Sequence, residues 1–313
     1  MRIIFMGTPA FAVESLKVLH QSNHAVVAVI TAIDKPAGRG RKLNQSAVKE
    51  YALSENLNIL QPNNLKDEGF LEQVKAFNAD MFVVVAFRML PKVLWSLPKY
   101  GTFNLHSSLL PDYRGAAPIN WVLVNGETKT GVTTFFINED IDTGEILLQE
   151  ETQIGADEDA GALHDRLMAI GAGLVLKTAN GLASDVLKPQ AQESNSHLNE
   201  APKIFKEDLR INPAESREQV YNLIRGMSPF PGAWGRISID GQEKTLKIFQ
   251  SEMYDLDESF EVGELRVLDK NNIILVFKDG ALRLKSLQIE GKRRMSSQDF
   301  INGRLLEKGA TMI

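Results

Sequence analysis

The sequence predicts an α/β fold, a doubly wound parallel sheet, followed by a small all-β domain. Three observations predict it: Val- and Ile-rich runs near the N-terminus, helix-like segments between them, and short β-type runs after a polar interruption. Strands that are buried on both faces of a parallel sheet read as continuous apolar runs. Their alternation with helices is typical of a doubly wound domain.

The first part of the chain alternates predicted strands with predicted helices. The strands are expected at residues 2–6, 25–32, 80–86, 132–137 and 145–149. The helices are expected at residues 10–21, 45–55, 67–77 and 160–182, with a helix-like stretch around 92–97. Pro9 would be the first residue of the first helix, a position that proline favours because its missing N–H has no intrahelical partner there.

The composition changes at residues 184–203, which are polar, contain two prolines and lack sustained periodicity. Such a segment indicates a linker. A short helix is expected at 213–226, and the strands after it are expected at 234–239, 245–253, 262–268, 272–278 and 281–290. Short strands at this spacing are typical of a small barrel or a sandwich. We therefore expect an α/β domain at 1–183, a linker at 184–206 and a C-terminal domain at 207–313.

The composition excludes several classes of protein. The chain has 313 residues, 43% hydrophobic and 24% charged, so we expect a buried core and not a disordered or coiled-coil chain. It contains no cysteine, which excludes disulfides, thiolate metal sites and a cysteine nucleophile. His20 and His24 have the spacing of helical metal ligands but flank a turn, so we expect no metal. No apolar run has membrane-spanning length and the N-terminus opens on a predicted strand, so we expect no membrane association and a cytoplasmic location.

The turn after the first predicted strand argues against a dinucleotide cofactor. Gly7-Thr8-Pro9 stands where a dinucleotide-binding fold carries G-x-G-x-x-G. Pro9 and Ala12 occupy the places of the second and third glycines, which allow the backbone to approach a pyrophosphate closely. We therefore interpret the segment as a tight turn and expect no NAD.

The most informative segment is 101–118, GTFNLHSSLLPDYRGAAP. Asn104 and His106 are two residues apart, so on an extended strand both side chains point to the same side. The turn-rich loop after them is the usual place for a site in an open α/β sheet. Downstream, the acidic turn EDIDTGE could bring a carboxylate to the imidazole. This turn contains Asp140, Asp142, Thr143 and Gly144.

Each of these features also has a structural interpretation. A histidine near a strand end is, taken alone, more often a structural residue than a catalytic one. An acidic segment such as EDIDTGE is, taken alone, most simply a solvated β-turn. The two segments together favour a catalytic site.

The segment NLHSSLLPDYRGAAPI, with IDTG behind it, resembles the signature of the formyltransferases that use 10-formyltetrahydrofolate. Three further segments, RIIFMGTPAFA, DKPAGRGRKL and VYNLIRGMSPFPGAW, resemble the members of this family that act on methionyl-tRNA. Because these segments span both predicted domains, the resemblance covers essentially the whole chain. It implies a Rossmann-like catalytic domain, a linker, and a C-terminal β-barrel of the oligonucleotide-binding (OB) type that contacts tRNA.

The resemblance implies transfer of a formyl group from 10-formyltetrahydrofolate to the α-amino group of methionyl initiator tRNA, for translation initiation. Asn104 matches the amide that donates to the oxyanion, His106 the imidazole that stabilises it or shuttles protons, and Asp142 the carboxylate that orients the imidazole. Residues that match the folate site are Ser108, Leu109, Leu110, Pro111, Ala86, Phe87, Arg88 and Leu90. The family commonly has Tyr-Gly where this chain has Phe87-Arg88, which puts a close backbone approach at Arg88 in doubt.

Residues outside the catalytic signature have to determine which molecule accepts the formyl group. The compact basic loop 34–43 carries Lys35, Arg39, Arg41 and Lys42, and suits contact with the phosphates of an acceptor stem. Lys203 and Lys206 match basic residues of the resembling family. Lys292, Arg293 and Arg294, on a strand-ending turn, are usable for contacts with the RNA backbone, although taken singly they suggest a solvated face. The formal charge of −5 means that RNA binding has to use such local elements.

Two other functions stay open at this point. One is a formyltransferase acting on a small amine or a sugar nucleotide, or a formyl-folate hydrolase, which would carry a different C-terminal module. The other is a non-catalytic RNA-binding protein, which would not need Asn104, His106 and Asp142 together. We expect the protein to act as a monomer.

Overall fold

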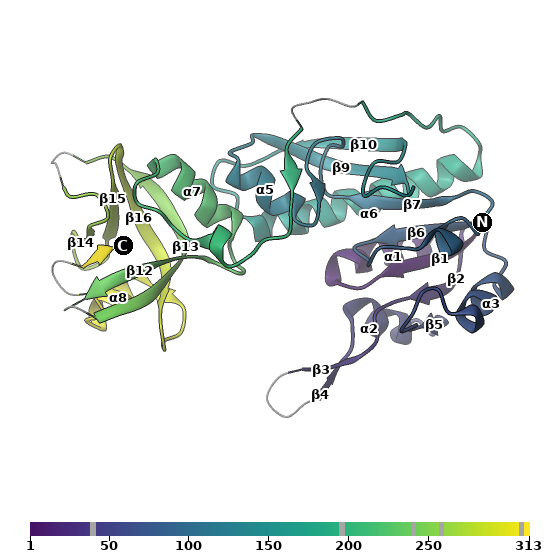
Figure 1. The fold of residues 1–313 in the computed structure, drawn as a ribbon, viewed down its shortest axis with the longest axis horizontal. Coiled ribbons are helices and arrows are strands. Elements are labelled where there is room, and N and C mark those ends of the chain that lie inside the picture. The colour runs from purple at the N-terminus through teal and green to yellow at the C-terminus, as the bar shows by residue number, and fades with distance from the viewer. Residues whose placement is uncertain (38–41, 194–197, 240–241, 257–259, 307–309) are drawn as a thin grey trace. The chain divides into compact units, whose positions relative to one another are not determined.

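The computed structural model describes residues 1–37, 42–193, 198–239, 242–256, 260–306 and 310–313. These residues form two units whose segments interleave along the chain. The first unit comprises Met1–Gly115, Thr130–Gln153 and His164–Glu200. The second unit comprises Ala116–Lys129, Ile154–Leu163 and Ala201–Ile313. Figure 1 shows the elements of each unit.

A seven-stranded sheet organises the first unit, in the order β10-β9-β7-β6-β1-β2-β5. Its strands are β1 (Arg2–Gly7), β2 (Ala25–Ile30), β5 (Ile59–Leu60), β6 (Met81–Val85), β7 (Thr102–His106), β9 (Lys129–Phe136) and β10 (Ile146–Gln153). The five strands from β5 to β7 pair in parallel, which confirms the predicted parallel sheet. The sheet is not parallel throughout, because β9 runs antiparallel to β7.

The helices of this unit follow the predicted alternation. They are α1 (Ala10–His20), α2 (Ala47–Ser54), α3 (Glu68–Ala76), α4 (Lys92–Trp95) and α6 (Ala160–Ala183), whose first residues belong to the second unit. The Ser46 and Asp67 side chains cap α2 and α3 by accepting the N–H groups of Lys49 and Phe70. The prediction that Pro9 is the first residue of α1 was wrong by one position. Its backbone is extended (φ −79°, ψ 173°), so Pro9 is the cap residue.

The strands β1, β2 and β6 form the centre of the core. Ile4, Met6 and Phe82 are buried there together with residues of α3 such as Phe70 and Val74. A short hairpin, β3 (Lys35–Ala37) and β4 (Lys42–Asn44), follows β2. This segment was predicted only as a basic loop, because three-residue strands are too short to show a hydrophobic periodicity.

A second sheet organises the second unit, in the order β14-β15-β16-β13-β12-β18. Its strands are β12 (Ala233–Ile239), β13 (Gln242–Tyr254), β14 (Leu265–Val267), β15 (Ile273–Phe277), β16 (Gly280–Ile289) and β18 (Thr311–Met312), with β17 (Met295–Ser296) beside β16. The N–H of Met312 donates to Gly263 O at 2.8 Å and that of Leu265 to Ala310 O at 2.9 Å. These bonds join the two edges of the sheet, so the C-terminal part is a barrel and not a sandwich.

The helices of the second unit are α5 (Pro118–Val124), α7 (Arg217–Gly226) and α8 (Ser297–Asn302), with a 3-10 turn at Glu207–Leu209. The predicted helix 213–226 begins only at Arg217, because Ser216 and Gln219 form a capping box there. Helix α7 covers the barrel core with Val220 and Ile224. No helix in the described ranges is long and apolar enough to cross a membrane.

Candidate active site

The strand β7 carries the two polar residues at the centre of the candidate site. Asn104 lies opposite Val84 of β6, and His106 lies opposite Thr133 of β9. His106 is buried, with 6% of its surface exposed, and Asn104 is half-buried. Within the described part of the chain, the Oδ1 atom of Asn104 is buried and accepts no hydrogen bond. A buried polar atom without a partner is costly, so it marks a place where a ligand can supply one.

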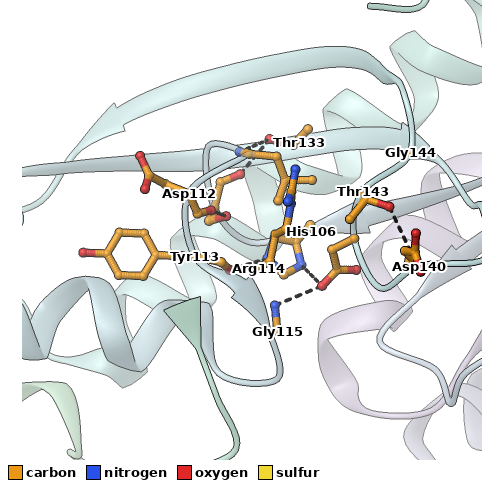
Figure 2. A network of polar contacts seen from close by, with 12 residues as sticks. His106, Asp112, Tyr113, Arg114, Gly115, Thr133, Asp140, Thr143 and Gly144 are labelled. Atoms are coloured by element: carbon orange, nitrogen blue, oxygen red, sulfur yellow. Dashed lines mark hydrogen bonds and ion pairs between the residues drawn. The ribbon is translucent and has the colours of Figure 1, made fainter. Parts of the chain in front are cut away.

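Both ring nitrogens of His106 face acceptors (Figure 2). Nε2 lies 2.8 Å from the main-chain oxygen of Tyr113. A carbonyl oxygen only accepts, so Nε2 carries a proton and donates it. Nδ1 lies 3.7 Å from Oδ2 of Asp142, so the two form an ion pair when Nδ1 is protonated. Nδ1 is therefore the ring atom that can exchange a proton.

Asp142 is held in the turn between β9 and β10 by main-chain geometry. Its φ of +54° lies in the left-handed region, which Asp tolerates better than most residues. Its Oδ2 atom accepts the N–H of Gly115 at 3.0 Å, which fixes the carboxylate toward His106. Gly144 is required in this turn, because a Cβ there would lie 1.6 Å from Phe136 O. The IDTG segment is therefore a constrained turn that presents a carboxylate.

The loop after β7 is held in place by a residue that the sequence analysis did not single out. The Thr133 hydroxyl donates to Ser108 O at 2.7 Å and accepts from Leu110 N at 3.1 Å. Gln149 adds bonds to Leu110 O and to the Thr133 hydroxyl. Thr133 lies in the buried strand β9, and only the pairing of this strand with β7 brings it to the site.

The residues that match a folate site lie at two neighbouring strand ends. Val85 pairs with Leu105, so the segment from Ala86 to Leu90 leaves β6 beside the end of β7 that carries His106. Ala86 has a left-handed backbone (φ +47°), and Leu90 is buried. The Arg88 guanidinium donates to the main-chain oxygens of Pro62 and Asn63, so this departure from the family pattern ties two loops together.

The other loop that matches the folate site, Ser108 to Pro111, follows β7 directly. The Ser108 hydroxyl donates to Asp112 O at 2.6 Å, which closes the loop on itself. Leu110 is buried at 3% exposure, whereas Leu109 and Pro111 are half-buried. The Ser108 hydroxyl is thus occupied within the loop. Leu109 and Pro111 are the residues of this segment with enough exposed surface to contact a ligand.

The basic residues predicted to contact tRNA are described in part. Lys35 is exposed on β3, Lys42 begins β4, and Arg39 and Arg41 lie outside the described residues. In the second unit the Lys203 ammonium lies 5.7 Å from the ring centre of Phe205. The Lys206 ammonium lies 5.2 Å from the ring centre of Trp234. The described part of the chain contains no cluster of three or more His, Cys, Asp or Glu side chains arranged to hold a metal ion.

Comparison with known proteins identifies the family. Residues 1–178 match the model of the family described as "Formyl transferase", and residues 203–305 match that of "Formyl transferase, C-terminal domain". The chain belongs to the formyltransferase family. As a member, it is a formyl-transferring enzyme, which confirms the resemblance and sets aside a non-catalytic function.

The formyltransferase has relatives over nearly its full length. A methionyl-tRNA formyltransferase of Flavobacterium johnsoniae is 51% identical over 97% of this chain and 96% of its own. A methionyl-tRNA formyltransferase of Parabacteroides distasonis is 49% identical over 97% of this chain and 95% of its own. Among solved structures, a sugar 3N-formyl transferase, WlaRD, superposes with a TM-score of 0.66 at 21% identity, covering 94% of this chain and 99% of that one. HypX from Aquifex aeolicus, in complex with tetrahydrofolic acid, superposes with a TM-score of 0.67 at 17% identity. The match covers 99% of this chain and 48% of the HypX chain. At these identities the two structures show a shared fold.

Proposed function

We propose that this formyltransferase transfers the formyl group of 10-formyltetrahydrofolate to the α-amino group of methionyl initiator tRNA. The observation that supports methionyl-tRNA as the formyl acceptor is the 51% identity, over 97% of the chain, to a relative named methionyl-tRNA formyltransferase. Identity of this extent includes both family regions, 1–178 and 203–305. We further propose that the enzyme works in the cytoplasm as a monomer.

Asn104 and His106 supply the polar groups that the reaction needs at the formyl carbon. When an amine attacks a formamide carbonyl, the carbonyl oxygen becomes negative and the amine has to lose a proton. The Asn104 amide donates two N–H groups, and its buried Oδ1 atom is free to accept an N–H of the amine. An amide in this position can therefore bind both the oxyanion and the nucleophile.

His106 and Asp142 act as a pair in this proposal. Nε2 of the ring is engaged with Tyr113 O, so Nδ1 is the atom through which the imidazole stabilises charge or passes a proton. Asp142, 3.7 Å away and held by the Gly115 N–H, orients the ring and forms an ion pair with it when Nδ1 is protonated. Bound 10-formyltetrahydrofolate would supply the activated formyl carbon. The residues that would hold it are Ala86, Phe87, Arg88, Leu90 and Ser108 to Pro111, at the ends of β6 and β7.

We assign catalysis to residues 1–183, a linker to 184–206 and tRNA contact to 207–313, aided by the basic loop 34–43. The cations that would contact tRNA are Lys35, Arg39, Arg41, Lys42, Lys203 and Lys206. Exposed lysines that can bind phosphates on an acidic chain support this assignment.

The proposal is tested by incubating the purified protein with 10-formyltetrahydrofolate and methionyl initiator tRNA. Methionyl elongator tRNA and an amino-sugar nucleotide serve as alternative acceptors in parallel reactions. We expect formyl-methionyl initiator tRNA as the main product. Absence of this product, equal formylation of both tRNAs, or preference for the sugar nucleotide would contradict the proposed acceptor.

A further inference from the structure

The side chain of Gln192 joins the two segments that fix the Asp142 carboxylate. Its Oε1 atom accepts two hydrogen bonds from the Arg114 guanidinium, at 3.1 Å from Nε and 2.6 Å from Nη2. Its Nε2 atom donates to the main-chain oxygens of Asp142, at 2.9 Å, and Gly144, at 2.7 Å. One amide therefore uses its acceptor on one segment and its donor group on the other.

We propose that Gln192 is a positioning residue for formyl transfer, which acts by holding the Asp142 carboxylate against His106. The inference rests on the proposed function, because it assigns Asp142 its role in that reaction. Gln192 contacts the main chain of Asp142 and not the imidazole, so it acts through Asp142.

Gln192 fixes the turn on both sides of Thr143. Asp142 has a left-handed backbone, a conformation that costs free energy unless the surroundings hold it. Bonds from a single amide to the oxygens of Asp142 and Gly144 hold the two peptide groups at a set distance. The direction of the Asp142 side chain follows from this main-chain geometry.

Gln192 also holds the segment whose N–H group the Asp142 carboxylate accepts. Asp142 Oδ2 accepts the N–H of Gly115, and Gly115 directly follows Arg114, the residue whose guanidinium Gln192 binds. The donor of the carboxylate and the turn that carries it are thus linked through the same side chain. A shift of about 1 Å at a reacting group can lower a rate by roughly 100-fold, so such a link matters for catalysis.

The segment that carries Gln192 is itself anchored. Gln190 pairs with Ile146, the first residue of β10, through main-chain bonds of 2.7 and 2.9 Å. This pairing places Gln192 beside the 142–144 turn, while the side chain of Gln190 stays exposed. Gln190 is therefore a matched control, since it is the same residue type in the same segment.

The chemistry requires an amide at position 192. A carboxylate in place of the Gln192 amide would still accept from Arg114 but could not donate to two carbonyl oxygens, and it would add a negative charge beside them. We expect Gln192→Glu to lower kcat roughly 10- to 100-fold, with the KM values for both substrates changed less than about 3-fold. We expect Gln190→Glu, which makes the same change of charge, to keep the wild-type kcat.

A double-mutant cycle separates positioning from general stability. If Gln192 acts through Asp142, then Gln192→Glu should have no further effect on kcat in an Asp142→Asn background. Gln192→Met, which keeps the size of the side chain without its polar atoms, provides a second variant in the same cycle, one that adds no charge. Wild-type kcat in both Gln192 variants, or effects that multiply with that of Asp142→Asn, would overturn the inference. Inactivity of the wild-type enzyme would instead contradict the proposed function.

Discussion

The Nδ1 atom of His106 lies 3.7 Å from Oδ2 of Asp142, while the opposite ring nitrogen is engaged by Tyr113 O. This relationship leaves one ring nitrogen for proton exchange and directs a carboxylate to it. Asn104, on the same strand, presents a buried amide oxygen without a partner among the described residues. Two polar residues of β7 and a carboxylate from the turn after β9 thus make up the proposed catalytic site.

Asn104→Ala tests the role of the amide in catalysis. Loss of a donor to a developing oxyanion typically costs about 10²–10³ in rate, so we expect kcat to fall by this factor. Because Oδ1 makes no hydrogen bond with any residue that the structure describes, the free energy of unfolding should change by less than about 1 kcal/mol. Steady-state kinetics and urea unfolding check the two parts. An unchanged kcat would remove Asn104 from the mechanism.

Gly144→Ala tests the constrained turn that carries Asp142. The new Cβ would lie 1.6 Å from Phe136 O, so the main chain has to move. We expect a loss of stability of about 2–3 kcal/mol together with a large loss of kcat. Gly173→Ala is the control, because Gly173 is exposed within α6 and nothing lies within 4 Å of its Cβ position. It should raise stability by about 0.5–1 kcal/mol at wild-type activity. Equal behaviour of the two variants would argue against the constraint.

Tyr221 makes the stability of the second unit depend on pH. Burial, with a hydrogen bond to Asp157 as the next cause, raises the pKa of Tyr221 to about 12 from an ordinary value of 10.0. The native state therefore keeps this proton at a pH where the unfolded chain loses it. Its contribution is complete below pH 10 and is lost as the pH rises toward 12.

Tyr221→Phe checks this expectation. The variant loses the hydrogen bond to Asp157 and should be about 1 kcal/mol less stable than wild type at neutral pH. The difference should shrink between pH 10 and 12, as measured by urea unfolding across that range. A constant difference across that range would show that Tyr221 does not titrate as expected.

Lys203 and Lys206 test the proposed contact with tRNA. Replacing each lysine by Glu should raise the KM for methionyl-tRNA. A plot of log KM against the logarithm of the salt concentration should also have a smaller slope for these variants. Lys75→Glu is the matched control, since this exposed lysine lies in the last turn of α3, before the start of β6. The control should keep the wild-type KM and salt dependence. The same salt slope in all four proteins would exclude these lysines from the contact.

The sequence alone predicted much of the fold because burial is encoded in local periodicity. The apolar runs of β1 and β6 identify central strands, and the two-residue spacing of Asn104 and His106 places both side chains on one side of β7. Gly144 of the IDTG segment indicates a turn, and the structure shows that a side chain at this position would clash with Phe136 O. The positions of these residues follow from covalent geometry over a few residues.

The tertiary structure decided which distant groups meet. Gln192 contacts Asp142 across a separation of 50 residues, and it lies in a polar segment that periodicity assigns only to a linker. Thr133 reaches the loop after β7 through the pairing of β9 with β7. The choice of a barrel over a sandwich likewise depends on bonds between residues 263–265 and 310–312. Such contacts depend on the path of the whole chain, because the sequence around a hydrogen-bonding residue does not indicate which distant residue it will contact. The sequence by itself indicated most of the longer strands and, through the family resemblance, the candidate catalytic residues. Only the folded chain decided what holds these residues in place.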